Sequence, residues 1–346
     1  MAHGVYLVGS VPMASARDVF CAVCDAVGPH LRWLPDGETG ERLDWVAGME
    51  PIFAANPALQ PSGRAFRLHP SAPPRTRYTL KPGKTVADIV FGDLGYLRHA
   101  RESFAEFQAL KAQGRIPAHV KFQVDLVPAH SVLWLFLEDD LHAAVDPIYN
   151  AAVMGELDAI AALIPHDQLA IQFDVASAVF ARLERAEASS YGGTKEEMQA
   201  TFSRILIAFC DRVPADVDLL LHFCYGDSNH KHVVDPTDMG DMVEFANRVT
   251  AGTTRDIQLI HFPVPRDRTD DAYFTPLGKL ALRPATEICL GLVHHTDGLI
   301  GTRARLASAR RHIQDFMIGT ECGFGRRRPD TIPELLRIHA QAASAP

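Results

Sequence analysis

Eight short apolar runs, rich in β-branched residues, alternate along the chain with stretches of helical periodicity. Such a run is typical of a buried strand, and a strand followed by a helix is typical of parallel strands joined by right-handed crossovers. Eight such units predict an α/β fold of the (β/α)8 TIM barrel class. The expected strands are residues 4–8, 31–34, 119–124, 169–173, 217–223, 257–261, 288–293 and 316–320, and the expected helices are residues 14–27, 86–113, 147–163, 195–212, 238–249, 307–314 and 332–339.

An open, doubly wound sheet is the alternative fold. It is disfavoured because no Gly-x-Gly-x-x-Gly motif follows the first expected strand. We expect a single barrel domain over residues 1–346 with two loop insertions, at residues 50–85 and 184–195. The first is rich in proline and arginine, and the second contains the sequence Ser-Ser-Tyr-Gly-Gly. Both follow expected strands closely enough to cover the C-terminal face of a barrel.

Charge and hydropathy narrow the class of protein. The formal net charge is −8 with both signs interspersed, so nucleic acid is not an expected partner, because phosphate binding needs a basic surface. The run at residues 326–328 is interpreted as a solvated face, with an anion-binding patch as the alternative. The chain contains no apolar stretch of about 18 residues, and its first residues read as a strand, so neither a membrane span nor a signal peptide is expected. With six cysteines in 346 residues, a cytoplasmic protein without a disulfide framework is expected.

Polar side chains recur where the expected strands end. Active sites of such barrels lie at the C-terminal ends of the strands, so residues distant in sequence can meet there. The rim residues are Ser10, Asp36, Glu38, Asp125, Asp174, His222, Cys224, His261, His294, His295, Glu321 and Cys322. The loop His230-Lys231-His232 is interpreted as exposed.

Two thiols and one or two imidazoles stand out in this set. His222 and Cys224 are two positions apart at a strand end, so both side chains point the same way. If Cys322 and His261 converge on them, the four form a site for a borderline-soft metal, of which zinc fits best. Buried core thiols are the alternative for the cysteines, and a hydrogen bond to substrate is the alternative for His261.

Five segments, in order along nearly the whole chain, carry a resemblance to a known family. They are Gly9-Ser10-Val11-Pro12, Asp36-Gly37-Glu38 with Glu41, Arg42 and Asp44, Ile171-Gln172-Phe173-Asp174, the segment from His222 to Asp227, and Glu321-Cys322-Gly323-Phe324. Together they resemble the catalytic C-terminal barrel of the cobalamin-independent methionine synthases. The His-x-Cys motif with the late Cys-Gly pair is its most specific part.

The resemblance implies a zinc ion held by one His, two Cys and a Glu. His222, Cys224 and Cys322 match three of these ligands, while His261 stands where the Glu is expected. His261 is then either a fourth ligand or the sign of a three-coordinate metal with a position open to substrate. The family's Asp-Glu-Pro is Asp174-Val175-Ala176 here, so one carboxylate is lost.

Further roles follow from the same resemblance. Glu38 and Asp174 would hold a substrate ammonium group, with Ser10 beside them, although Ser10 could simply cap a helix. His294 or His295 would be the general acid, and Trp134 approximates the tryptophan that stacks on a pterin.

The implied reaction is a methyltransferase reaction like that of the family, in which a methyl group passes from 5-methyltetrahydrofolate to homocysteine. More generally, it is zinc-dependent transfer of an alkyl group from a small-molecule donor to a small-molecule thiol. A zinc-dependent thioether lyase or dealkylase with a non-folate substrate is one alternative. A barrel with a closed, non-catalytic zinc site is another, and a metal-free decarboxylase-type barrel is a third.

Overall fold

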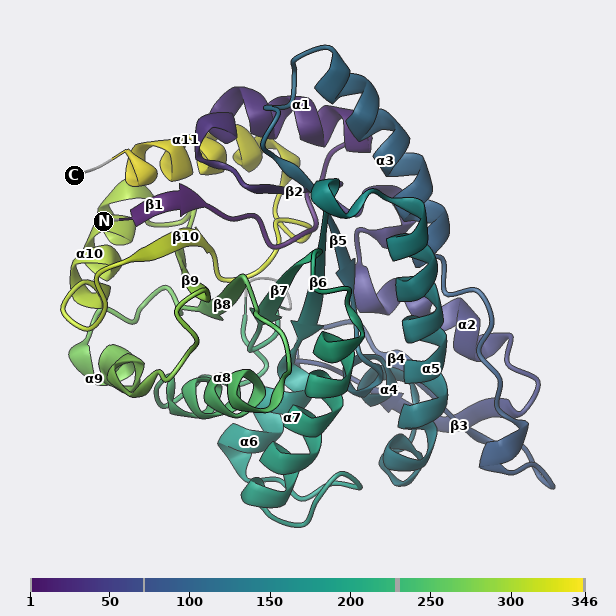
Figure 1. Ribbon diagram of the computed structural model, residues 1–346. Helices are drawn as coiled ribbons and strands as arrows, with labels where there is room; N and C mark the ends of the chain where they lie inside the picture. The colour runs from purple at the N-terminus through teal and green to yellow at the C-terminus, as the bar shows by residue number, and fades with distance from the viewer. Residues whose placement is uncertain (1, 71, 228–230, 345–346) are drawn as a thin grey trace.

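A curled sheet of eight parallel strands forms the centre of the protein (Figure 1). The structure is a computed structural model, and it describes residues 2–70, 72–227 and 231–344. Around the sheet the strands run β1, β10, β9, β8, β7, β6, β5 and β2, so each lies beside its neighbour in sequence except at the β1–β2 side, where the described residues form no ladder. The strands are β1 (Ala2–Val5), β2 (Trp33–Pro35), β5 (Lys121–Leu126), β6 (Leu169–Val175), β7 (Asp218–Phe223), β8 (Leu259–Pro263), β9 (Glu287–Val293) and β10 (Phe316–Thr320).

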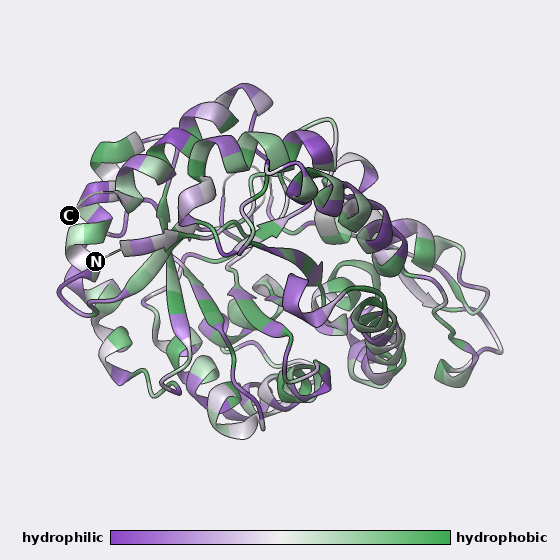
Figure 2. Cartoon of the chain, turned by 45° about the horizontal axis from the view of Figure 1, so that its top comes forward, coloured by the Kyte–Doolittle hydropathy of each residue, from purple (hydrophilic) through white to green (hydrophobic). Residues whose placement is uncertain are grey.

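Each of the eight expected strands overlaps one of these, which confirms an α/β fold with a parallel sheet. The strands could be predicted from continuous apolar runs, because both faces of a parallel sheet are buried and most strand residues are therefore apolar. Figure 2 shows this as hydrophobic residues running along the strands, while the surrounding helices carry both kinds of residue.

Helices surround the sheet, and the chain alternates between the two kinds of element. The expected helix at 14–27 is α1, which begins after Ser15, whose hydroxyl accepts the Asp18 N–H. The helices are α1 (Ala16–Val27), α2 (Glu50–Ala54), α3 (Tyr96–Ala112), α4 (Ala129–Phe136), α5 (Asp139–Leu163), α6 (Ser177–Arg185), α7 (Lys195–Arg212), α8 (Gly240–Gly252), α9 (Asp271–Phe274), α10 (Gly298–Ala309) and α11 (Ile332–Ala343). No helix in the described part of the chain is long and apolar enough to cross a membrane.

The long helix expected over residues 86–113 is shorter in the structure. Residues Val86–Asp88 form one 3-10 turn, and α3 begins only at Tyr96, after Gly95 with a φ of 91°. A left-handed residue ends any helical run, and glycine adopts that conformation without steric cost.

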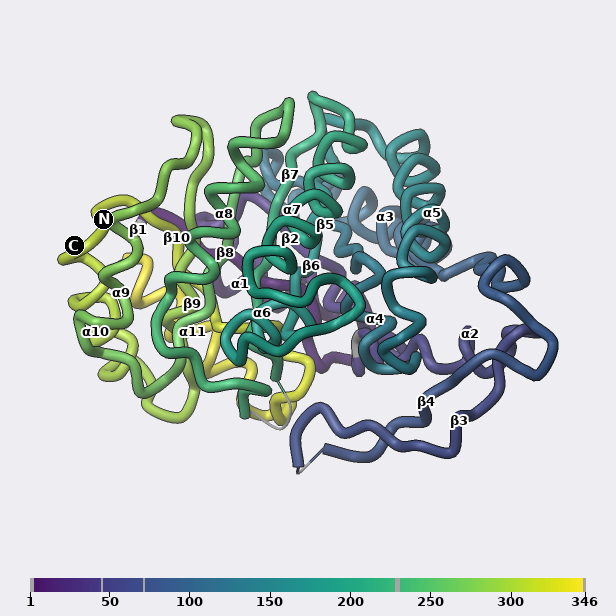
Figure 3. Tube along the Cα trace, turned by 90° about the horizontal axis from the view of Figure 1, so that it is seen from below, coloured from purple at the N-terminus to yellow at the C-terminus, as the bar shows by residue number. Residues whose placement is uncertain are grey.

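The segment at residues 50–85 contains secondary structure that the sequence did not reveal. It holds α2 and an antiparallel hairpin of β3 (Leu59–Phe66) and β4 (Arg75–Leu80), which lies beside α2 and α4 at one side of the sheet (Figure 3). Most of its strand residues keep some exposure, so they lack the apolar pattern of the central strands. Residues 184–195 connect α6 to α7 with a single β-bridge between Ser189 and Gly192.

Alternate residues of the strands point inside the curled sheet. Towards the N-terminal ends these are apolar, and they form one cluster of Tyr6, Val8, Trp33, Ala170, Leu220, Leu259, Cys289 and Met317. Two residues further along the same strands, the period of two places polar side chains on the same face, as at Gln172, His222 and His261. The interior therefore changes from an apolar floor to a polar rim at the C-terminal ends.

Candidate metal centre

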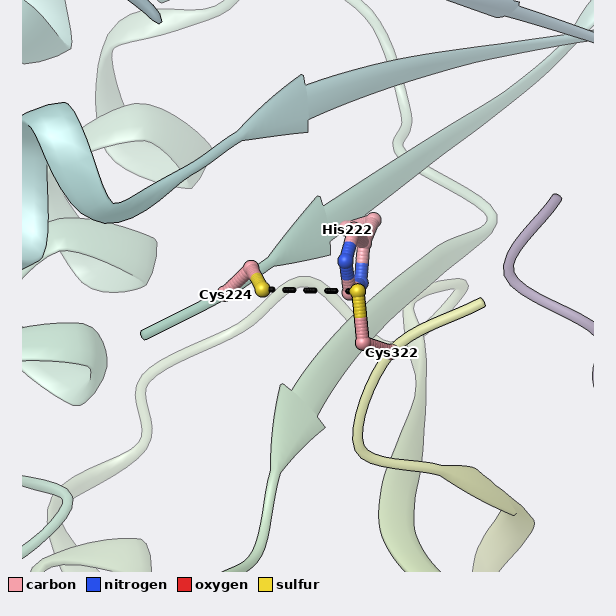
Figure 4. Close-up of side chains that lie close together, drawn as sticks. All are labelled: His222, Cys224 and Cys322. Atoms are coloured by element: carbon pink, nitrogen blue, oxygen red, sulfur yellow. Dashed lines mark hydrogen bonds between the residues drawn. The ribbon is translucent and has the colours of Figure 1, made fainter. Parts of the chain in front are cut away.

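His222, Cys224 and Cys322 meet at this rim. His222 is the inward-facing residue near the end of β7, Cys224 follows the same strand, and Cys322 follows β10. Their ligand atoms all lie within 4.8 Å of one another, and the two Sγ atoms are 3.6 Å apart (Figure 4). Residues separated by 98 positions in sequence thus form one group of donors.

The backbone around the two cysteines holds their sulfur atoms in place. The Cys224 N–H donates to the carbonyl of Val175, which continues the β6–β7 pairing past the strand end. The Gly226 N–H donates to Cys224 Sγ at 3.2 Å. After Cys322, a Cβ on Gly323 would lie 2.5 Å from the Ser10 hydroxyl, so only glycine lets the segment approach Ser10 this closely.

The donor set fits a zinc ion. Zn–S bonds of about 2.3 Å at a tetrahedral angle put two sulfur atoms roughly 3.8 Å apart, close to the separation of the two cysteines. The hydrogen bond to Cys322 and burial raise the pKa of the Cys224 thiol. Arg326 lines the same space, and Cys322, Asp227 and Asp44 raise its pKa against the effect of burial. A metal would therefore have to displace the thiol protons on binding.

His261 lies behind His222 and outside this group of donors. It is fully buried, and its Nε2 is 2.9 Å from the carbonyl oxygen of Thr320. A carbonyl only accepts, so Nε2 carries the proton; burial lowers the pKa of His261 to about 4, which keeps the ring neutral. Its bare Nδ1 is 2.8 Å from His222 Nδ1 and accepts a hydrogen bond from the His222 Nδ1–H group. This leaves the lone pair of His222 on Nε2, the tautomer that a ligand needs.

A cavity of 230 Å³ opens onto the three donors. Four further residues expected at the site line it with them: Ser10, Glu38, Trp134 and Asp174. Leu68, Ala72 and Arg75 bring the β3–β4 hairpin to the same cavity, and Phe66 packs on the Trp134 ring with centroids 5.3 Å apart. The first insertion therefore forms one wall of the cavity, whereas the second insertion, residues 184–195, does not contribute to its lining.

Glu38 is held in an unusual backbone conformation. Its φ is 45°, in the left-handed region that a glutamate rarely adopts. Asp36 Oδ1 accepts the Glu38 N–H at 2.8 Å, and Asp36 is itself fixed by Arg42 Nη2 at 2.7 Å and the Ser103 hydroxyl at 2.7 Å. Burial and the nearby charge of Asp174 raise the pKa of Glu38 to about 8. The charges of Arg42 and Arg326 oppose this rise without reversing it, so the cavity wall carries a buried carboxyl group whose pKa stays raised.

His294 and His295 do not line this cavity. The Nε2 atom of His294 is 2.9 Å from the carbonyl of Val264, and its Nδ1 is 3.6 Å from Glu321 Oε1. His295 is half-buried, near enough to Asp330 and Glu334 to influence their pKa values.

Glu321 and His232 form an ion pair that sequence analysis missed. His232 Nε2 is 2.7 Å from Glu321 Oε2, and the His232 side chain is 13% exposed, so the expectation of an exposed loop is wrong at this residue. His230 lies outside the described residues. Burial raises the pKa of Glu321, but His294, His232 and Arg327 outweigh it and lower that pKa to about 2. A charged carboxylate therefore sits directly before Cys322 in the chain.

Arg326 and Asp227 also belong to the cavity wall, although the sequence placed Arg326 in a charge run interpreted as solvated. Their proximity to the cysteine motifs in sequence was the one available signal. Residues that lie close in sequence to a predicted metal ligand are expected at the same rim of the sheet as that ligand.

Comparison with solved structures identifies the fold. A B12-independent methionine synthase from Shewanella sp. W3-18-1, in complex with selenomethionine, matches over 85% of this chain and 77% of that chain, with a TM-score of 0.51 and 13% identity. A protein from Listeria monocytogenes assigned as a vitamin-B12-independent methionine synthase matches over 95% of this chain and 86% of that chain, with a TM-score of 0.52 and 12% identity. No protein-family model matches the sequence, and no curated protein matches it. Because sequence identity to both structures is low, the similarity lies in the backbone fold. The protein has the fold of the B12-independent methionine synthases.

Proposed function

We propose that the protein is a zinc-dependent enzyme that transfers an alkyl group, most simply methyl, to the sulfur of a small-molecule thiol. The observation that carries this proposal is the convergence of His222, Cys224 and Cys322 on one cavity. The fold shared with B12-independent methionine synthases supports it, and methyl transfer to homocysteine is the form of the reaction to test first.

The three donors would hold zinc, and His261 would act as a positioning residue for His222. Zinc bound there would lower the pKa of a bound substrate thiol, so that the sulfur is a thiolate at neutral pH. In the overall reaction the thiol loses its proton and a sulfur–carbon bond forms. The leaving group of the alkyl donor departs with the electron pair of the broken bond.

The other cavity residues have binding roles in this proposal. Glu38 and Asp174 would accept hydrogen bonds from a substrate ammonium, and the Ser10 hydroxyl would bind a polar group beside them. Trp134 would offer an aromatic face to the alkyl donor. His294 contacts Glu321 and a carbonyl oxygen, so we assign it to holding Glu321, and the proton donor to the leaving group would be solvent.

A closed structural zinc site is the main rival, and one observation disfavours it. All three donors line the cavity, so a metal among them would face open space on one side. Structural zinc sites are closed by four protein ligands, whereas catalytic sites keep a position for substrate.

Two features of the whole chain belong to the same proposal. We infer a closed (β/α)8 barrel over residues 1–346, because the rings of Tyr6 and Trp33 meet with centroids 6.4 Å apart across the β1–β2 side. We also place the protein in the reducing cytoplasm, where the thiols of the centre would persist.

The test is the zinc content of the purified protein and of Cys322→Ala, with Cys210→Ala as the matched control. Cys210 is a fully buried thiol on α7 that has no part in the centre. We expect about one zinc per chain in the wild type and in Cys210→Ala, and none in a folded Cys322→Ala. In the cobalt-substituted protein, added homocysteine should change the thiolate absorption bands.

Zinc that is absent, or retained by Cys322→Ala, would refute the metal centre. Cobalt bands that no added thiol alters would support the closed structural site. Turnover assays with methyl donors then separate the catalytic alternatives, because a dealkylase would release a thiol where a transferase consumes one.

A further inference from the structure

Arg326 is a cation on the wall of the cavity at the metal centre. It lines this space together with Cys224 and Cys322. In the part of the chain that the structure describes, its guanidinium forms no ion pair and donates no hydrogen bond. None of its nitrogen atoms is fully buried, so a molecule in the cavity can reach them. A half-buried guanidinium without a partner suits a planar anion, because its fork of N–H groups matches both oxygens of a carboxylate.

The backbone just before Arg326 is packed tightly against Ser10. The Phe324 N–H donates to the Ser10 carbonyl at 2.6 Å. A Cβ on Gly325 would lie 2.7 Å from the Ser10 hydroxyl, so the close approach requires glycine at that position. Because the same short segment begins at Cys322, the guanidinium and the Cys322 sulfur belong to one wall of the cavity.

The other charges on this wall leave the guanidinium available. Burial lowers the pKa of Arg326, but Cys322, Asp227 and Asp44 outweigh it and raise that pKa, with Cys322 acting most strongly of the three. Asp44 is itself paired, because its Oδ2 lies 2.5 Å from Arg75 Nη2. Arg326 is therefore charged, and it lies close to a sulfur atom that would bind the metal.

We propose that the thiol substrate carries an acidic group, such as a carboxylate, a few carbon atoms from its sulfur, and that Arg326 binds this group. The inference rests on the proposed function, because it takes the thiol to be bound at the metal centre. Two parallel N–H···O bonds would fix the acid while the sulfur faces the metal. A thiol without an acidic group would leave the guanidinium unpaired and should bind less well.

Recognition of an acid by Arg326 is separate from recognition of an ammonium by Glu38 and Asp174. Homocysteine carries both groups, so its binding alone cannot distinguish the two contacts. Three analogues can: 4-mercaptobutyrate lacks the ammonium group, 3-mercaptopropylamine lacks the carboxylate, and 1-propanethiol lacks both. The acid is then tested by comparing 4-mercaptobutyrate with 1-propanethiol.

Titration of the cobalt-substituted full chain with these thiols measures their affinities from the thiolate absorption bands, without turnover. We expect 4-mercaptobutyrate to bind at least about tenfold more tightly than 1-propanethiol, because its acid forms charged hydrogen bonds. Arg326→Gln should abolish this preference and should not weaken binding of 3-mercaptopropylamine. Arg326→Lys keeps the charge but not the fork, so it should keep part of the preference. Both variants should still hold about one zinc per chain.

Arg328→Gln is the matched control. It removes the same charge two positions further along, where the side chain is 81% exposed and pairs with Asp330 at 2.9 Å. The preference for 4-mercaptobutyrate over 1-propanethiol should then change by less than about twofold.

Equal affinities for these two thiols in the wild type would overturn the proposal while leaving thiol binding at the metal intact, and this comparison decides even if Arg326→Gln fails to fold. A preference that survives in a folded Arg326→Gln would also overturn it.

A second titration tests Arg326 if no thiol alters the cobalt bands, in which case the proposed function fails. The as-purified full chain is titrated calorimetrically with 4-(methylthio)butyrate and with 4-(methylthio)-1-butanol, which lacks the acid. Saturable binding of the acid alone, lost in Arg326→Gln, would support the anion-binding role by itself. The absence of saturable binding of the acid would overturn that role.

Discussion

Replacing His261 tests whether the tautomer of His222 is set from behind the metal centre. In the structure His222 Nδ1 donates to His261 Nδ1 at 2.8 Å, and His261 Nε2 donates to the Thr320 carbonyl at 2.9 Å. His261→Phe keeps a ring of similar size but removes both bonds, so the buried Nδ1–H of His222 loses its acceptor.

The expected magnitude follows from the cost of that lost acceptor. A buried donor without a partner costs about 1–3 kcal/mol, or roughly 5- to 150-fold in an equilibrium constant. Loss of an outer-shell partner of a metal-bound histidine typically costs about 10- to 100-fold in metal affinity. The two estimates overlap, so zinc should bind to His261→Phe about 10- to 100-fold more weakly.

Competition with a chelator of known affinity measures this directly, without reference to activity. His261→Asn retains an oxygen acceptor for His222 and should recover part of the loss. Cys210→Ala is the matched control: it shortens a fully buried side chain on α7, so it should lower stability and leave zinc affinity unchanged.

Two outcomes would refute the reasoning. If His261→Phe loses zinc entirely, as Cys322→Ala should, then His261 is itself a ligand, as the sequence alone allowed. If zinc affinity changes by less than about twofold, the chain of hydrogen bonds does not position His222.

Two further predictions concern buried charges. Burial raises the pKa of Glu38 to about 8, above its value in an unfolded chain, so its contribution to stability is fully present below about pH 4 and is lost as the pH rises to about 8. Glu38→Gln should therefore melt a few degrees higher than the wild type at pH 8 and about the same at pH 4 in differential scanning fluorimetry; an equal difference at both pH values would contradict this. Arg305 is fully buried, whereas its partner Asp297, 2.6 Å away, is 32% exposed, so Asp297→Ala should reduce the free energy of unfolding by about 1–2 kcal/mol in urea titrations. The double variant with Arg305→Met should recover part of that loss, and a cost below about 0.5 kcal/mol for Asp297→Ala would show that water replaces the carboxylate.

The central strands were predictable because burial on both faces leaves a plain apolar signal. The β3–β4 hairpin lacked that signal, since its residues are mostly half-exposed and one of its strands contains Pro61. Its contribution to the cavity wall was therefore visible only in the structure.

The candidate donors were predictable for a related reason. Period two along β7 puts His222 and Cys224 on one face, and parallel strands bring their C-terminal ends to one rim, so the approach of Cys322 follows from the fold class. The sequence could equally accommodate His261 as a ligand, because its position at a strand end is like that of His222.

What the sequence by itself determined is the order of elements and the set of side chains that reach the rim, because both depend on local periodicity. Only the tertiary structure decided how those side chains are paired. His261 faces His222, His232 faces Glu321 across 89 positions, and Arg326 lines the cavity at the metal centre. Each of these depends on contacts between distant segments and on side-chain rotation, which a residue's own neighbours in sequence do not fix.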